Sequence, residues 1–98
     1  MKMIKMAKTA KKNSSVSIII PVFNEGINLK YLIKIIEATT DVPHELLIVY
    51  DFPSDNSVPV VKSFQKTYPN LRSVYNQKGR GVINAIRSGV EVAKNVQR

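Results

Sequence analysis

The chain has 98 residues, of which 44% are hydrophobic, and a formal net charge of +8. This length leaves room for one small domain, and this hydrophobic share is ordinary for a globular chain and argues against general disorder. The sequence contains no cysteine, which excludes disulfides and thiolate metal sites and fits a reducing cytosol.

The positive charge is concentrated at the start of the chain. Residues 1–14 contain five lysines and no acid. This segment is too short and too charged for a membrane span and lacks the apolar core of a secretory signal. We predict a basic flexible leader over residues 1–14. Its lysines also suggest attraction to anionic lipid headgroups, whereas its lack of aromatic and arginine residues disfavours specific nucleic-acid binding.

The first predicted elements are a strand, an amphipathic helix and a second strand. An apolar run predicts a buried strand over about residues 16–21. In the helix that follows, Asn28 is the expected N-cap. The core face of this helix comprises apolar residues at helical spacing, namely Leu29, Leu32, Ile33 and Ile36. Turn residues at 39–43 end the helix, and a second apolar run predicts a strand over about residues 45–50.

A loop dense in turn residues follows the second strand, over residues 51–57. Asn56 or Ser57 is expected to cap a second helix, which Pro59 is suited to begin. The inner face of this helix is predicted to comprise Val60, Val61, Phe64 and Tyr68. A Pro-Asn pair at 69–70 marks its end.

The last predicted elements are a short strand over residues 71–75 and a final helix over about residues 82–96. A glycine-rich turn at residues 77–81 connects them. The final helix is expected to bury its large apolar residues Ile83, Ile86 and Val90, together with Ala93.

The order of elements is therefore β-α-β-α-β-α, with connections too long for hairpins. This order predicts an α/β fold, a three-layer, Rossmann-like parallel sheet joined by right-handed crossovers. Ligands of such sheets bind at the carboxyl ends of the strands, where the loops at 21–26, 51–57 and 76–81 would meet.

The candidate binding residues lie in these three loops. Asp51 directly follows a buried strand, so its carboxylate suits a base edge or a ribose hydroxyl, although turn or helix-cap roles remain open. Asp55 fits a site carboxylate or a helix cap equally well. Phe23 is suited to cover a flat base or the end of the core. Glu25 is either a site carboxylate or a charge favoured at a helix start.

The glycine-rich turn offers cations and free amides to a phosphate through Lys78 and Arg80, as many surface turns would. His44 is the only histidine and is expected at the opposite end of the sheet, either on the surface or supporting another residue, without a catalytic part. The chain has neither a G-x-x-x-x-G-K-[ST] loop nor a G-x-G-x-x-G at the first turn, which argues against P-loop and dinucleotide-binding proteins.

Three segments together resemble a known family. Residues 16–25 (VSIIIPVFNE), 45–57 (ELLIVYDFPSDNS) and 76–89 (NQKGRGVINAIRSG) are similar to the first strand, second strand and glycine-rich turn of family 2 glycosyltransferases. These are GT-A type enzymes that use nucleotide-sugar donors. The resemblance covers about residues 16–95 and leans toward the dolichol- or polyprenyl-phosphate mannosyltransferase-like branch.

The resemblance implies a nucleotide-sugar site and its residues. The positions that would border the donor are Pro21, Phe23, Glu25, Asp51, Lys78, Gly79, Arg80 and Gly81. Asp51 would match the family aspartate that hydrogen-bonds the base. Many members carry Asp-Asp-Gly-Ser where this chain has Tyr50-Asp51-Phe52-Pro53, so the first acid is replaced and the second kept.

The resemblance also implies Mg²⁺ or Mn²⁺ for the complete enzyme, held by a motif that would follow Arg98. We therefore expect residues 15–98 to be a partial donor-binding domain for a GDP- or UDP-sugar, without catalytic or metal-binding residues and inactive alone. Its acceptor would be a polyprenyl phosphate, and its place cytoplasmic, peripheral at the inner membrane face.

Three alternatives from other classes remain at this stage. One is a non-catalytic nucleotide-binding domain. A receiver-like signalling domain is the second, but it needs an acidic pair after the first strand, where this chain has Pro21-Val22-Phe23. The third is a basic module that binds membranes or nucleic acid through residues 1–14.

Overall fold

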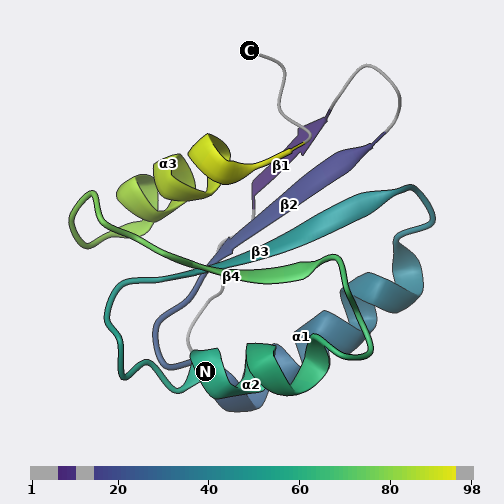
Figure 1. Cartoon of the computed structure of the whole chain (residues 1–98), viewed down its shortest axis with the longest axis horizontal. Helices are drawn as coiled ribbons and strands as arrows, with labels where there is room; N and C mark the ends of the chain where they lie inside the picture. Colours follow the sequence, from purple (N-terminus) through teal and green to yellow (C-terminus); the bar gives the residue numbers. More distant parts are fainter. Residues whose placement is uncertain (1–6, 11–14, 95–98) are drawn as a thin grey trace.

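The computed structural model describes residues 7–10 and 15–94. It contains strands β1 (Ala7–Ala10), β2 (Val16–Pro21), β3 (His44–Tyr50) and β4 (Leu71–Tyr75), and helices α1 (Gly26–Thr39), α2 (Ser57–Phe64) and α3 (Val82–Val92). The sheet has the order β1-β2-β3-β4 (Figure 1). Strand β3 pairs in parallel with both β2 and β4, so the predicted α/β fold with a parallel sheet is confirmed.

Strand β1 was not predicted. It lies within the segment expected to be a flexible leader and pairs antiparallel with β2, with Ala7 opposite Ile19 and Ala10 opposite Val16. The remainder of that segment, residues 1–6 and 11–14, lies outside the described residues. The described part of the predicted leader thus forms an edge strand beside β2.

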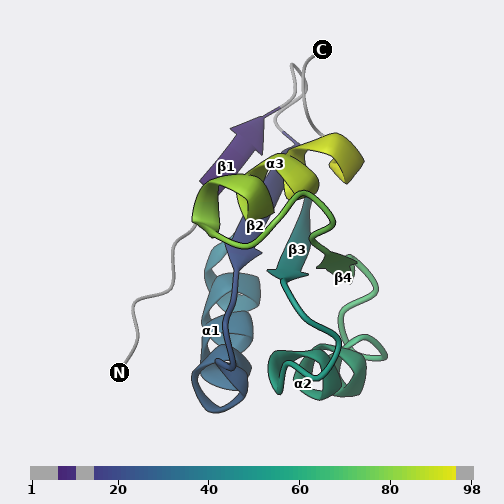
Figure 2. The same cartoon turned by 90° about the vertical axis from the view of Figure 1, so that its left-hand side faces the viewer.

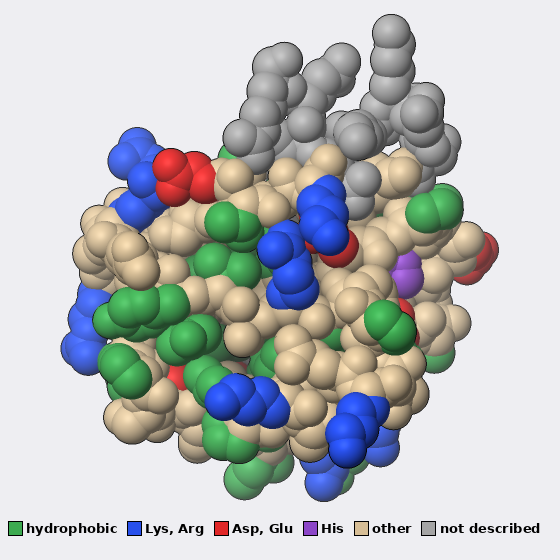
Figure 3. All heavy atoms as spheres, viewed as in Figure 1, with side chains coloured by type: hydrophobic (Ala, Val, Ile, Leu, Met, Phe, Trp, Pro, Cys, Tyr) green, Lys and Arg blue, Asp and Glu red, His purple; other side chains and the backbone are tan. Residues whose placement is uncertain are grey.

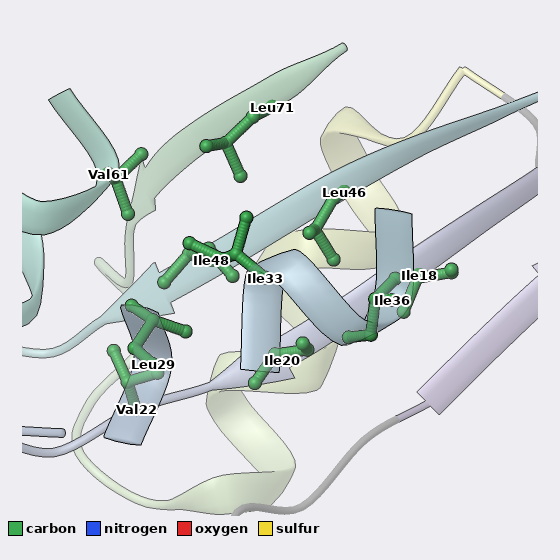
Figure 4. Close-up of a cluster of buried hydrophobic side chains, with 10 residues drawn as sticks. All are labelled: Ile18, Ile20, Val22, Leu29, Ile33, Ile36, Leu46, Ile48, Val61 and Leu71. Carbon is green, nitrogen blue, oxygen red and sulfur yellow. The ribbon is translucent and has the colours of Figure 1, made fainter. Parts of the chain in front are cut away.

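The helices cover both faces of the sheet (Figure 2). Because successive side chains of a strand point to opposite faces, Ile18 and Ile20 join one core cluster while Ile19 joins another. The first cluster packs under α1 and α2 and is the larger (Figure 4): Ile18, Ile20, Val22, Leu29, Ile33, Ile36, Leu46, Ile48, Val61 and Leu71. The second, under α3, comprises Ile19, Leu47, Val49, Ala85 and Ala93.

Helix α3 approaches the sheet through small residues. Its buried residues are Ala85, Ser88 and Gly89, and a Cβ atom on Gly89 would lie 2.5 Å from Cγ2 of Ile19. The prediction that Ile83 is buried was therefore wrong, since its side chain is 70% exposed. Hydrophobic periodicity predicted that the face with large apolar side chains is buried. In the structure, the face with small side chains packs against the sheet, because it allows a close approach.

Three predicted helix limits also differ from the structure. Helix α3 ends at Val92 rather than near residue 96, because Ala93 already has an extended backbone. Helix α1 begins at Gly26 rather than after a cap at Asn28, because acceptors from a distant loop satisfy its first amides, as described below. Helix α2 ends at Phe64, earlier than predicted. Tyr68 still packs against the core, from the turn that follows the helix.

Candidate functional site

A pocket of about 330 Å³ opens at the carboxyl ends of β2 and β3, as the fold predicts. Hydrophobic side chains gather on the left of Figure 3, the side where the loops after β3 and β4 run in Figure 1. The pocket is lined by Pro21, Val22, Phe23, Glu25, Asp51, Phe52, Arg80, Gly81, Val82 and Ala85. All three predicted loops therefore contribute to its wall.

The first and second loops are joined by hydrogen bonds in both directions. The backbone N–H of Asn24 donates to Oδ2 of Asp55 at 3.1 Å, and the N–H of Asn56 donates to Oδ1 of Asn24 at 3.0 Å. The N–H of Glu25 donates to Oγ of Ser57 at 3.0 Å, and the N–H of Gly26 to Oδ1 of Asn56 at 2.9 Å. Acceptors from the second loop thus take the place of a local cap at the start of α1.

The backbone at this junction has strict steric requirements. Asn24 has a φ of 49°, a left-handed conformation that asparagine tolerates better than most residues. A Cβ atom on Gly26 would lie 2.7 Å from the carbonyl oxygen of Asn56, so a larger residue there would push the two loops apart. Asp55 is buried and also accepts from the N–H of Ser57 at 2.7 Å. Asp55 is therefore a structural cap, which decides between its two predicted roles.

Asp51 is held from the third loop. Nδ2 of Asn76 donates to Oδ1 of Asp51 at 2.6 Å, and the N–H of Gly81 donates to Oδ2 at 3.4 Å. Asn76 is itself buried and fixed, because its Oδ1 accepts from the N–H of Lys78 at 3.0 Å and from Oγ of Ser88 at 2.8 Å. The carboxylate at the pocket therefore has a defined orientation.

Aromatic rings and one cation form another part of the pocket. The rings of Phe23 and Phe52 meet edge to face with centroids 5.5 Å apart. The guanidinium carbon of Arg80 lies 5.5 Å from the centroid of Phe52. Both rings and the cation line the pocket, so it offers apolar walls, one fixed carboxylate at Asp51 and a positive charge beside them.

Six of the eight predicted site residues line this pocket: Pro21, Phe23, Glu25, Asp51, Arg80 and Gly81. Lys78 and Gly79 do not. Nζ of Lys78 lies 2.9 Å from Oε2 of Glu91 on α3, and the carbonyl of Gly79 accepts from Nδ2 of Asn76 at 2.7 Å. The glycine-rich turn thus presents Arg80 to the pocket and directs Lys78 to the neighbouring helix.

Sequence reasoning did not single out several lining residues. Phe52 directly follows Asp51 in the second loop and lines the pocket. Its position next to an acid at a strand end could have indicated this role from the sequence. Val82 and Ala85 line the pocket because α3 begins there, and their apolar character alone does not distinguish them from core residues. Asn76 lay within a predicted loop, but its contact with Asp51 depends on the tertiary fold.

The opposite end of the sheet contains a second polar cluster, around the buried Glu45. Its carboxylate accepts hydrogen bonds from Oγ of Ser17 at 2.6 Å, from Nη2 of Arg72 at 3.0 Å and from the N–H of Lys94. Burial raises the pKa of Glu45, but these hydrogen bonds and the charge of Arg72 outweigh it and hold the pKa below its ordinary value. This cluster fastens the chain after α3 to the sheet.

His44 lies at this same end, as predicted, but its side chain is only 10% exposed. Its Nε2 lies 3.0 Å from Oε1 of Glu37, and its Nδ1 lies 2.9 Å from the carbonyl oxygen of Val42. Of the two expected positions it takes the supporting one, since it links α1 to the start of β3.

The described residues, 7–10 and 15–94, contain no group of three His, Cys, Asp or Glu side chains that could hold a metal ion. The carboxylates that line the pocket are those of Glu25 and Asp51. No helix in the described part of the chain is both long and apolar enough to span a bilayer.

Comparison with known proteins places the chain in a family. Residues 17–96 match the family described as Glycosyl transferase family 2. The chain is similar to the protein named Uncharacterized glycosyltransferase YibD of Escherichia coli (strain K12), with 31% identity over 80 residues, which are 82% of this chain and 23% of that relative. The chain thus spans less than a quarter of that protein's length. No solved structure matches the chain. The fold, its three converging loops and this match establish that the chain belongs to glycosyl transferase family 2.

Proposed function

We propose that the pocket binds the nucleoside diphosphate part of a nucleotide-sugar donor, a GDP- or UDP-sugar, and that the chain is the donor side of a glycosyltransferase. The observation that carries this proposal is the convergence of three loops on Asp51, which Asn76 and Gly81 hold at the pocket. The fixed carboxylate of Asp51 beside apolar walls suits the donor groups of a base edge or a ribose, which a phosphate-only site would not need.

The proposed roles follow from the chemistry of each wall. Asp51 accepts hydrogen bonds from the base or ribose. Phe23 and Phe52 give the flat base an aromatic surface, for which face and edge contacts are favourable. Arg80 supplies the positive charge for the diphosphate, which a guanidinium can bind through two hydrogen bonds. Pro21, Glu25 and Gly81 complete the border of the donor site.

Lys78 and Gly79 contribute to the proposed donor site indirectly, through the shape of the glycine-rich turn. Lys78 pairs with Glu91, and Gly79 accepts from Asn76, so both shape the turn that carries Arg80. Gly79 has a φ of 100° and Gly81 a φ of 119°, values that favour glycine at both positions. The turn would therefore position Arg80 and the N–H of Gly81 rather than bind phosphate through its lysine.

We extend the proposal to the complete reaction. The acceptor is a polyprenyl phosphate, as in the dolichol-phosphate mannosyltransferase-like branch, and the reaction takes place at the cytoplasmic face of a membrane. The Mg²⁺ or Mn²⁺ that would neutralise the leaving diphosphate, and the base for the acceptor, would come from residues that this chain does not contribute. The chain alone would bind nucleotide without transferring sugar.

Calorimetric titration of the full chain with UDP and with GDP tests the donor site. We expect one of them to bind and Asp51→Asn to weaken its binding by at least about tenfold, because a hydrogen bond to a charged acceptor contributes about 1.5–3 kcal/mol. Asp41→Asn is the matched control, since Asp41 is exposed in the loop after α1, outside the pocket. Equal affinity of the Asp51→Asn variant, or binding of neither nucleotide, would refute the site.

A transfer assay tests the second part of the proposal. The chain is incubated with radiolabelled GDP-mannose or UDP-glucose, Mn²⁺ and a polyprenyl phosphate. We expect no labelled lipid, with nucleotide binding intact in the same preparation. Metal-dependent formation of labelled lipid would show that the chain suffices for catalysis and would contradict this part alone.

A further inference from the structure

The outward face of α1 carries an apolar stripe. Ile27, Tyr31 and Ile35 are spaced four residues apart, so they lie in one row along the helix. Their side chains are 80%, 57% and 58% exposed, respectively. The opposite side of α1 already supplies the core, through Leu29, Ile33 and Ile36. The helix is therefore apolar on two faces, and the fold accounts for only one of them.

Two lysines run beside this stripe. Lys30 and Lys34 are exposed and lie one helical turn after Ile27 and Tyr31. Nζ of Lys30 is 5.6 Å from the ring centroid of Tyr31, and Nζ of Lys34 is 5.8 Å from that of Phe64 on α2. Both ammonium groups therefore lie over aromatic rings.

The layer formed by α1 and α2 has an excess of exposed positive charge. Lys62 and Lys66 extend it on and after α2. Within the bounds of these two helices Glu37 is the one acid, and its side chain, 9% exposed, pairs with His44. Lys and Arg side chains accordingly gather with hydrophobic ones along the lower edge of Figure 3, where α1 and α2 lie in Figure 1.

We propose that the α1 face, defined as Ile27, Lys30, Tyr31, Lys34 and Ile35, docks on the surface of an anionic lipid bilayer. The two isoleucines and the tyrosine would enter the headgroup region, and the lysines would pair with lipid phosphates. A purely apolar protein partner would have to desolvate both ammonium groups, whereas the bilayer interface accepts apolar and cationic groups side by side.

The helix also sets the orientation of the docked domain. Helix α1 begins at Gly26, directly after the loop that carries the pocket residues Phe23 and Glu25. Docking through α1 would bring this end of the domain to the membrane surface. The inference does not depend on the proposed function, because vesicle binding requires no nucleotide and is measured without one.

Vesicle flotation of the full chain is the first test. We expect binding to vesicles of equal parts phosphatidylcholine and phosphatidylglycerol and little binding to phosphatidylcholine alone. Removing Lys30 and Lys34 (K30Q/K34Q) should weaken binding about fivefold per lysine, and Ile27→Ser/Ile35→Ser should weaken it by at least about tenfold. All four positions are exposed, so urea unfolding should change little.

The matched control is K62Q/K66Q, which removes two exposed lysines from α2 and the turn after it, where no large exposed apolar stripe is present. It should retain most of the binding. Equal losses in the α1 and control variants would show that overall charge, including the lysines of residues 1–14, drives binding, and would overturn the proposal. Absence of binding to the anionic vesicles would do the same.

Single-tryptophan reporters locate the contact independently of affinity. The chain has no tryptophan, so Tyr31→Trp and Tyr75→Trp each introduce one fluorophore. Tyr75 is 41% exposed on the edge strand β4. We expect a blue shift on anionic vesicles, and quenching by brominated lipid, for the reporter at 31 and not for the one at 75. A shift at 75 without one at 31 would place the contact elsewhere.

Discussion

Asn76 holds Asp51 in place through a hydrogen bond of 2.6 Å from its Nδ2 to the Oδ1 of the aspartate. The two residues follow neighbouring parallel strands, β3 and β4, which explains how positions 25 residues apart in sequence meet at one edge of the sheet. The carboxylate that defines the pocket is thus oriented from the loop after β4, and the amide that orients it is buried.

Replacing Asn76 by aspartate should therefore damage both stability and binding. The new carboxylate cannot donate to Asp51 and would face it as a like charge, so we expect a loss of about 2 kcal/mol or more in unfolding free energy at neutral pH. Urea unfolding measures the loss. Ser88→Ala, which removes one donor to Asn76, serves as the milder comparison and should cost about 1 kcal/mol. Equal stability of N76D and the wild type would contradict the role given to this amide.

The two cations of the glycine-rich turn should behave differently. Arg80→Gln should weaken nucleotide diphosphate binding by about tenfold, because Arg80 lines the pocket above Phe52. Lys78→Gln removes the same charge two residues earlier, but its ammonium group lies on Glu91, outside the pocket. It should change the affinity by less than about twofold. Calorimetric titration compares the two variants, and a larger effect at Lys78 would reverse their proposed roles.

The Glu45 cluster predicts a dependence of stability on acid pH. The folded pKa of Glu45 lies below its ordinary value of 4.5, so the unfolded chain takes up this proton first as the pH falls. The stabilisation by ionised Glu45 is complete above its ordinary pKa of 4.5 and is lost as the pH falls through the lower pKa of the folded chain. Urea unfolding midpoints are measured from neutral pH to below pH 4.5. As the pH decreases, the midpoint should fall less steeply for Glu45→Gln than for the wild type, and Ser17→Ala should be intermediate. Parallel curves for all three proteins would exclude this linkage.

Gly89 should not tolerate a side chain in the wild-type background. A Cβ atom would lie 2.5 Å from Cγ2 of the buried Ile19, so Gly89→Ala should cost about 1–3 kcal/mol despite its better helix propensity. In an Ile19→Ala background, the same change should become neutral or stabilising by about 1 kcal/mol. A double-mutant cycle followed by urea unfolding measures this coupling, and purely additive effects would argue against the close contact.

Sequence reasoning succeeded where local pattern and strand periodicity decide the structure. The apolar runs correctly predicted three parallel strands. The limits of β2 and β4 agree with the prediction. It placed Asp51 and Arg80 at one pocket because the ends of parallel strands meet at one edge. It failed on the packing of α3, where Gly89 rather than Ile83 faces the sheet. Periodicity ranks residues by hydrophobicity and carries no information about how closely two backbones approach.

The remaining differences have a common origin in tertiary contacts. The start of α1 was placed at Asn28 because a local cap was assumed, whereas Asn56 and Ser57 supply the acceptors from another loop. Lys78 was grouped with Arg80 because they are neighbours in sequence, but Glu91 on α3 holds it away. Strand β1 depends on pairing with β2, and its sequence has no apolar run to reveal it.

The junction between the first two loops has a consequence for how the chain acquires its structure. The N–H groups at positions 24 to 26 find their side-chain acceptors 30 to 32 residues later, at Asp55, Asn56 and Ser57. The first turn of α1 can therefore be completed only after β3 has aligned and delivered that segment. Closing this loop of the chain costs conformational entropy before the hydrogen bonds between the two loops can form and offset it. Synthesis past Ser57 is thus the earliest point at which this end of the domain can reach its native form.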